Sequence, residues 1–244
     1  MIETIPPALT GANALFLDFD GTLVGFARIP RDVTVAPRLV PTLERVRDRL
    51  GGALAIVTGR EIANVTEMLA PLVTPVAGSH GAERRRPDGG IETPGADVAA
   101  EAAEIAARFR AELGDIDNMI IEHKVYSVAL HFRNAPAAED RVRAAAHAVL
   151  SHRPDWEGTP GKLVVEVRPA AFSKGSAVRA FMAEPPFAGR VPVFVGDDVT
   201  DEAGMEAAAA LGGFGIKVGT GQTLARYRLS GPDEVHAYLS AFAD

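Results

Sequence analysis

The chain has 244 residues, 47% of them hydrophobic, and a formal net charge of −7, which suits one large or two small domains and gives no basic surface for a nucleic acid. It contains no cysteine, which excludes disulfides and thiolate metal sites. Because it also lacks a secretory signal and any apolar stretch near the ~20 residues that span a bilayer, a cytoplasmic protein without membrane or nucleic-acid partners is expected.

Three short apolar runs, each ending in polar residues, predict strands of the protein core. Continuous apolar runs are typical of strands that are covered on both faces in a parallel sheet. A helical pattern follows each run, and strands alternating with helices predict a doubly wound, Rossmann-like α/β domain with its ligand site at the carboxyl ends of the strands. The expected strands are residues 14–17, 54–57 and 191–195, and the expected helices are residues 35–50, 61–69 and 201–211.

The middle of the chain predicts a second, smaller α+β domain. Here amphipathic helical patterns alternate with pairs of strands that carry apolar residues at every second position. The expected order is a helix at 97–113, strands at 119–126 and 127–133, a helix at 137–150, a short strand near 155–157 and a strand at 162–167. We therefore expect a core domain of residues 1–84 and 170–244, with a cap domain of residues 85–169 inserted into it.

Acidic residues follow the first and the last of the apolar runs. Asp18 and Asp20 stand two residues apart at a strand end, so both can face the same cavity. Asp197, Asp198 and Asp201 follow the last run. Carboxylates that converge need compensation, and an all-oxygen site without cysteine selects a hard cation such as Mg²⁺. The alternative, acids placed at a helix N-terminus for its dipole, explains Asp201 but not the two preceding aspartates.

Two further polar residues are placed to hold an anion. Thr58 follows the second apolar run, and Lys174 begins the helix that leads to the last one. A hydroxyl with neighbouring main-chain amides, or an ammonium group, could bind a phosphate oxygen at this edge of the sheet.

In this order the motifs resemble those of the haloacid dehalogenase superfamily. The motifs are Asp18-Phe19-Asp20-Gly21-Thr22-Leu23, Thr58-Gly59-Arg60, Lys174-Gly175 and Gly196-Asp197-Asp198-Val199-Thr200-Asp201-Glu202. The resemblance implies that Asp18 attacks phosphorus and that Asp20 is the general acid and base. The residues that it implies for phosphoryl binding are Thr58 and Lys174, and those for Mg²⁺ are Asp18, the main-chain carbonyl of Asp20, Asp197 and Asp201.

The expected cap strands are charged on one face and apolar on the other. The apolar face should pack on the two cap helices, whereas the charged face is either simply solvated or binds a polyhydroxylated ligand. A narrower resemblance, to trehalose-6-phosphate phosphatases, rests on Gly78-Ser79-His80-Gly81, Glu122-His123-Lys124, His131-Phe132-Arg133 and the segment from Lys162 to Glu166. It implies sugar contacts by Glu122, Lys124, Arg133, Lys162 and Glu166, with Arg60, His80 and His131 as further candidates.

The resemblance implies a Mg²⁺-dependent monomer that hydrolyses trehalose 6-phosphate to trehalose and phosphate and works beside a trehalose-6-phosphate synthase. One alternative is a phosphatase of the same superfamily that acts on sucrose phosphate, mannosyl-phosphoglycerate or a monosaccharide phosphate. Another is a phospho-receiver module that keeps the phosphate on Asp18. Asp20 argues against the receiver, because a general base beside an acyl phosphate shortens its lifetime.

Overall fold

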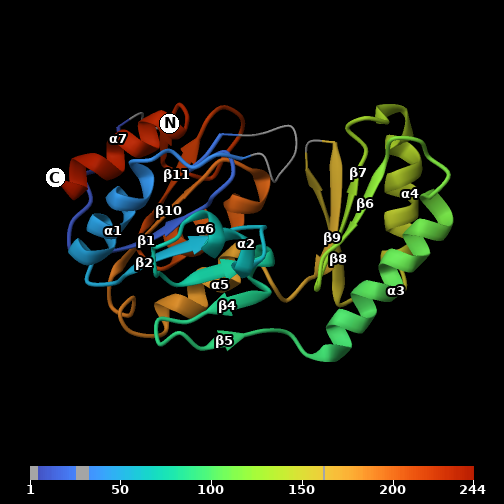
Figure 1. Ribbon diagram of the computed structural model, residues 1–244, viewed down its shortest axis with the longest axis horizontal. Coiled ribbons are helices and arrows are strands. Elements are labelled where there is room, and N and C mark those ends of the chain that lie inside the picture. Colours follow the sequence, from blue (N-terminus) through green and yellow to red (C-terminus); the bar gives the residue numbers. More distant parts are fainter. Residues whose placement is uncertain (1–4, 26–32, 162) are drawn as a thin grey trace. The chain divides into compact units, whose positions relative to one another are not determined.

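The computed structural model describes residues 5–25, 33–161 and 163–244, so Lys162, an expected sugar ligand, lies outside the described residues. The chain forms two compact units. The first is made of Met1–Glu92 and Ser173–Asp244, and the second, green to yellow in Figure 1, is Thr93–Phe172. In the described part of the chain, no helix has both the length and the apolar character needed to cross a bilayer.

An eight-stranded sheet forms the centre of the first unit, in the order β12-β11-β10-β1-β2-β3-β4-β5. The strands from β12 to β3 are parallel, whereas β4 and β5 add an antiparallel edge. The three apolar runs form β1, β2 and β10 at its centre, which confirms the predicted mostly parallel α/β fold. The strands are β1 Asn13–Leu17, β2 Leu54–Val57, β3 Val76–Gly78, β4 Glu83–Arg85, β5 Ile91–Glu92, β10 Val191–Gly196, β11 Phe214–Val218 and β12 Tyr227–Leu229.

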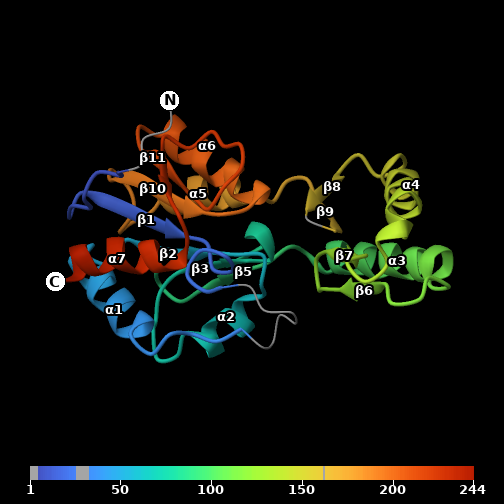
Figure 2. The same ribbon diagram turned by 90° about the horizontal axis from the view of Figure 1, so that it is seen from above.

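Helices cover both faces of this sheet, with α1 and α7 packed together on one face and α5 and α6 on the other (Figure 2). The helices are α1 Leu39–Arg49, α2 Ile62–Met68, α5 Lys174–Met182, α6 Glu202–Ala210 and α7 Pro232–Ala243. Helix α1 begins later than the predicted residue 35, because the chain turns at Pro37 and Arg38 before the helix starts. Pro41 is tolerated in its first turn, where a main-chain N–H has no acceptor within the helix.

The first crossing between the units comes after Glu92, not after residue 84 as expected. The reason is that the β4–β5 hairpin extends the core sheet, since β4 pairs with β3. The guanidinium groups of Arg84 and Arg86 also bind Glu184, which follows α5 in the first unit. The return crossing comes after Phe172, because β9 runs to Pro169 and the next residue still bonds to the second unit, through Asp155.

The second unit is a four-stranded antiparallel sheet, in the order β6-β7-β9-β8, with two helices on one face. Its elements follow the expected order: α3 Ala96–Leu113, β6 Ile120–His123, β7 Val128–His131, α4 Glu139–Leu150, β8 Trp156–Gly161 and β9 Val164–Pro169. Apolar residues of β7 and β9, such as Leu130 and Val165, pack on Phe109 of α3 and Val142 of α4. Strand β8 is longer than expected because it pairs with β9 along its whole length, and an edge strand tolerates its Pro160.

Candidate active site

The carboxyl ends of β1 and β10 bring the two acidic motifs together. These strands are parallel neighbours with Leu17 opposite Val195, so Asp18 and Asp197 leave the sheet side by side. One carboxylate oxygen from each of Asp18, Asp197 and Asp201 lies within 4.8 Å of the others. Asp18 and Asp201 are buried, and Asp197 is half-buried. Carboxylates of the two acidic motifs therefore converge, namely those of Asp18, Asp197 and Asp201, whereas Asp20 was expected to bind the metal through its main-chain carbonyl.

The loop after Asp18 depends on Gly21. Its φ of 81° is unfavourable for other residues, and a Cβ atom there would lie only 2.4 Å from Oδ2 of Asp197. This close approach places the next hydroxyl, of Thr22, 3.3 Å from both Asp18 Oδ2 and Asp197 Oδ1. Thr22 therefore links the first acidic motif to the last.

Lys174 enters the cluster from the N-terminus of α5, which Ser173 caps by accepting the main-chain N–H of Ser176. Glycine at the next position, 175, allows close packing on α6, because a Cβ atom there would lie 2.5 Å from the carbonyl oxygen of Ala203. The Lys174 ammonium, only 3% exposed, donates to Asp18 Oδ1 at 2.6 Å and to Asp201 Oδ1 at 2.7 Å. One cation thus joins two buried carboxylates.

Burial and mutual repulsion shift the ionisation of this cluster. Burial, followed by the charge of Asp201, raises the pKa of Asp18 well above its usual range, although Lys174 opposes the shift. The same two causes raise the pKa of Asp197 to about 6. Burial alone would lower the pKa of Lys174, but the charges of Asp18 and Asp201 outweigh it and raise that pKa. Three clustered carboxylates, two of which bind the ammonium of Lys174, leave an excess of negative charge, and this all-oxygen donor set fits a hard divalent cation.

The carboxylate of Asp20 is engaged elsewhere. Arg60 Nε donates to Asp20 Oδ2 at 2.6 Å and Arg60 Nη2 donates to Oδ1 at 2.8 Å, while the guanidinium lies over the Phe19 ring. The Asp20 side chain is 31% exposed, so it remains accessible to a ligand. Arg60, expected as a sugar contact, therefore binds the residue that was expected to be the general acid.

Thr58 directly follows β2, His80 lies just after β3, and a main-chain hydrogen bond joins the two residues. Thr58 is buried, and its hydroxyl accepts the main-chain N–H of Arg60 at 3.1 Å. Its main-chain carbonyl accepts the N–H of His80 at 2.9 Å. Ser79 and His80 have φ values of 48° and 56°, which residues other than glycine rarely adopt and which cluster at functional sites.

The polar face of the cap sheet carries paired charges. Glu122 and Glu166 both stand opposite Ala129 in the register, which places them on one face of the sheet. Oε1 of Glu166 accepts from Lys124 Nζ at 3.1 Å and from the hydroxyl of Ser127 at 2.9 Å, a contact that the sequence did not suggest.

The edge of the same face carries a second pair. His131 Nε2 lies 2.8 Å from Oε2 of Glu122, and this hydrogen bond lowers the pKa of Glu122. Arg133, two residues further on, is exposed. Glu122, Lys124, His131 and Glu166, four of the expected sugar ligands, thus gather at one polar surface.

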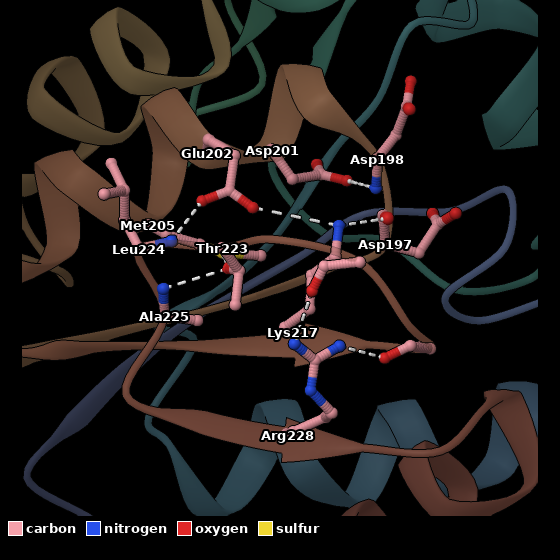
Figure 3. A network of polar contacts seen from close by, with 12 residues as sticks. Asp197, Asp198, Asp201, Glu202, Met205, Lys217, Thr223, Leu224, Ala225 and Arg228 are labelled. Carbon is pink, nitrogen blue, oxygen red and sulfur yellow. Dashed lines mark hydrogen bonds and ion pairs between the residues drawn. The ribbon is translucent and has the colours of Figure 1, made fainter. Parts of the chain in front are cut away.

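Sequence reasoning missed Lys217. It lies in β11 and donates from its ammonium to the main-chain carbonyl of Asp197 (Figure 3). The available signal was a charged residue within the apolar run Phe214–Val218, where an unpartnered lysine would be unfavourable.

Known proteins resemble this chain over most of its length. A family model described as trehalose-phosphatase matches residues 16–233. A probable trehalose-phosphate phosphatase of Sinorhizobium fredii is 44% identical over 211 residues, which are 84% of this chain and 77% of that protein. The trehalose-6-phosphate phosphatase of Escherichia coli is 37% identical over 239 residues, 97% of this chain and 88% of that protein.

Solved structures agree with this assignment. The crystal structure of a trehalose-6-phosphate phosphatase related protein superposes with a TM-score of 0.74 at 27% identity, over 94% of this chain and 96% of that one. The resemblance to trehalose-6-phosphate phosphatases, and with it to the haloacid dehalogenase superfamily, is confirmed.

Proposed function

The chain belongs to the trehalose-phosphatase family, and on that premise we propose that it hydrolyses trehalose 6-phosphate to trehalose and phosphate through an aspartyl-phosphate intermediate. The observation that carries the chemistry is the cluster of Asp18, Asp197 and Asp201, in which Lys174 binds the two buried carboxylates, those of Asp18 and Asp201. The names of the relatives at 37% and 44% identity support the choice of substrate.

Asp18 is the proposed nucleophile. Its carboxylate attacks phosphorus, the bond from phosphorus to the sugar oxygen breaks, and one difficult displacement becomes two easier steps. Lys174 holds one oxygen of Asp18 at 2.6 Å and Thr22 lies 3.3 Å from the other, so the carboxylate is oriented before substrate arrives. Lys174 and the hydroxyl of Thr58 are the proposed ligands of the transferred phosphoryl oxygens.

Asp20 is the proposed general acid and base. It protonates the departing sugar oxygen and later takes a proton from the water that attacks the aspartyl-phosphate. Both of its oxygens accept from Arg60 in the structure, and both bonds weaken when Asp20 carries the proton, because they are then no longer assisted by the negative charge of the carboxylate. We therefore propose that Arg60 positions Asp20, in addition to its expected role as a substrate contact.

Mg²⁺ is the proposed metal, held by Asp18, Asp197, Asp201 and the main-chain carbonyl of Asp20. When bound, it neutralises charge on the transferring phosphoryl group and aligns the attacking and leaving oxygens. The excess negative charge of the cluster supports this choice, because a divalent cation would balance it.

We propose that the second unit acts as the cap and supplies substrate specificity. The sugar-binding residues proposed are Glu122, Lys124, Arg133, Lys162 and Glu166, with His131 and His80 as further contacts. Charged partners form strong hydrogen bonds with hydroxyls, which both donate and accept. The expected monomeric state, partnership with a trehalose-6-phosphate synthase and cytoplasmic location stay predictions.

The proposal is tested by measuring phosphate release from a panel of esters, with metal-stripped protein and after addition of Mg²⁺. The panel contains trehalose 6-phosphate, sucrose 6-phosphate, glucose 6-phosphate and p-nitrophenyl phosphate. We expect the highest kcat/KM with trehalose 6-phosphate and no turnover without metal. Metal-dependent release that favours another sugar phosphate would retain the chemistry and refute the substrate, and a stable phosphoprotein without turnover would favour the receiver alternative.

A further inference from the structure

We propose that Lys217 is a positioning residue for the metal-binding carboxylates, acting through the main chain between Asp197 and Asp198, with Glu202 balancing its charge. This inference rests on the metal site proposed above. It concerns a buried lysine that stands outside the motifs from which the site was expected.

The sheet register places Lys217 beside the acidic motif. Strand β11 is parallel to β10, and Lys217 stands opposite Gly196, the last residue of β10. The lysine is only 4% exposed, as buried as its apolar neighbours in the strand, Ile216 and Val218. A buried ammonium is unfavourable unless it is both paired and hydrogen-bonded.

Lys217 has two partners among the residues that the structure describes, and the two contacts differ in kind (Figure 3). Its ammonium donates to the main-chain carbonyl of Asp197. It also lies 3.8 Å from Oε1 of Glu202, too far for a hydrogen bond but close enough for an ion pair. Glu202 itself is anchored, because its Oε2 accepts the main-chain N–H of Leu224 at 2.8 Å. The directional bond of Lys217 therefore goes to Asp197, and Glu202 supplies mainly compensating charge.

The peptide unit between Asp197 and Asp198 is consequently held at both ends. Lys217 binds its carbonyl, and Oδ2 of Asp201 accepts its N–H at 2.8 Å. The other oxygen of Asp201 accepts from Lys174, which in turn binds Asp18. A continuous chain of contacts thus runs from β11 through this peptide unit to the proposed nucleophile.

This arrangement fixes the direction in which Asp197 leaves β10. An oxygen of the Asp197 carboxylate lies within 4.8 Å of oxygens of Asp18 and Asp201. A rotation of the peptide unit that follows Asp197 would displace this carboxylate. Lys217 and Glu202 carry opposite charges, so the pair changes the net charge of the cluster little. Its effect on the metal site is therefore geometric. Groups that orient metal ligands typically change metal affinity by about 10- to 100-fold when they are removed.

The test is the affinity of metal-stripped full-length protein for Mn²⁺, measured from the electron paramagnetic resonance signal of free Mn²⁺. The main variant is the double substitution Lys217→Met with Glu202→Gln. It removes both charges together, which avoids leaving an uncompensated carboxylate that could unfold the protein. We expect the Kd for Mn²⁺ to rise by about tenfold or more. Circular dichroism and the thermal transition without metal establish that the variant is folded.

Arg228→Leu is the matched control from the same network. Its guanidinium donates to the main-chain carbonyls of Gly219 and Gly221, not to Asp197. We expect this variant to keep the Mn²⁺ affinity within about twofold of the wild type, because the loss of a group outside the chain of contacts leaves the ligands in place.

Glu202→Gln alone separates charge from geometry. If Lys217 acts by positioning Asp197, the Glu202→Gln variant binds Mn²⁺ more tightly than the double variant, because the bond from Lys217 to Asp197 is kept. A folded double variant that binds Mn²⁺ as tightly as the wild type would overturn the role of Lys217 while leaving the proposed function intact. A wild-type protein that binds no Mn²⁺ would instead refute the metal site, and this inference with it.

Discussion

Replacing Lys174 by Met should be among the most damaging single changes to the first unit. Lys174 is 3% exposed and makes charge-assisted bonds of 2.6 and 2.7 Å to Asp18 and Asp201, so its loss leaves two buried carboxylates without their shared cation. Breaking a buried pair in this way destabilises proteins by about 3–5 kcal/mol. The transferred phosphoryl group would lose a ligand as well, and kcat should fall by about 10²–10³.

The stability loss should depend on pH in a defined direction. Lys174 lowers the pKa of Asp18, which burial and Asp201 raise, so the pKa rises further in the variant. A carboxyl group whose pKa is raised by folding opposes folding once the unfolded chain is ionised. The penalty should therefore be larger at about pH 8 than at about pH 5, and should shrink further below the ordinary carboxyl pKa of ~3.9.

Urea unfolding of metal-free protein at both pH values measures this effect. Far-UV circular dichroism follows the whole chain, whereas Trp156, the only tryptophan, reports on the core of the second unit. Arg179→Met is the matched control, because Arg179 is an exposed cation of the same helix, and it should change stability by less than about 0.5 kcal/mol. A Lys174→Met protein as stable as the control, or one that is destabilised more in acid, would refute the reasoning.

Substitutions at three further positions test separate parts of the site. Arg60→Ala should lower kcat by about 10-fold or more without changing Mn²⁺ affinity, because Arg60 binds Asp20 through two hydrogen bonds. Arg60→Lys should restore little of the lost kcat, because an ammonium cannot replace the bidentate guanidinium. Full rescue by Lys would contradict bidentate positioning of Asp20. Glu166→Gln should raise KM for trehalose 6-phosphate by about 10-fold yet spare kcat/KM for p-nitrophenyl phosphate, and equal losses on both would remove Glu166 from the sugar site. Gly21→Ala places a Cβ atom 2.4 Å from Asp197 Oδ2 at a φ of 81°. Urea unfolding should therefore show a loss of ~1–3 kcal/mol in stability, and Mn²⁺ titration should show weaker metal binding. Unchanged stability and affinity would show that the loop relaxes.

The central sheet could be predicted from sequence because its signals are local. Each apolar run ends in polar residues, and parallel strands bring their carboxyl ends to one edge, so the meeting of Asp18 with Asp197 required only that their two strands be neighbours, which the structure shows. Residues 85–92 were expected in the cap domain because the charged sequence of the β4–β5 hairpin resembles a solvated turn. Its membership of the core sheet depends on pairing with β3, which no local pattern encodes.

Pairs that are distant in sequence were the other failure. The contact of Arg60 with Asp20 spans 40 positions and requires β1 and β2 to be neighbours with a particular loop between them. Lys217 could be noticed as a charge within an apolar strand, but its partner is fixed by the register of β11 against β10. In both cases the residue type was visible and its target was not.

The most direct test of the proposed chemistry is Mg²⁺-dependent phosphate release from trehalose 6-phosphate by Asp18→Asn beside Asp198→Asn. Asp18 belongs to the buried cluster, whereas Asp198 is an exposed neighbour in the sequence of Asp197. We expect the first variant, folded by circular dichroism, to lose about 10³-fold or more of the wild-type rate, and the second to keep about a third or more of it. A folded Asp18→Asn protein that retains a comparable rate would contradict Asp18 as the nucleophile.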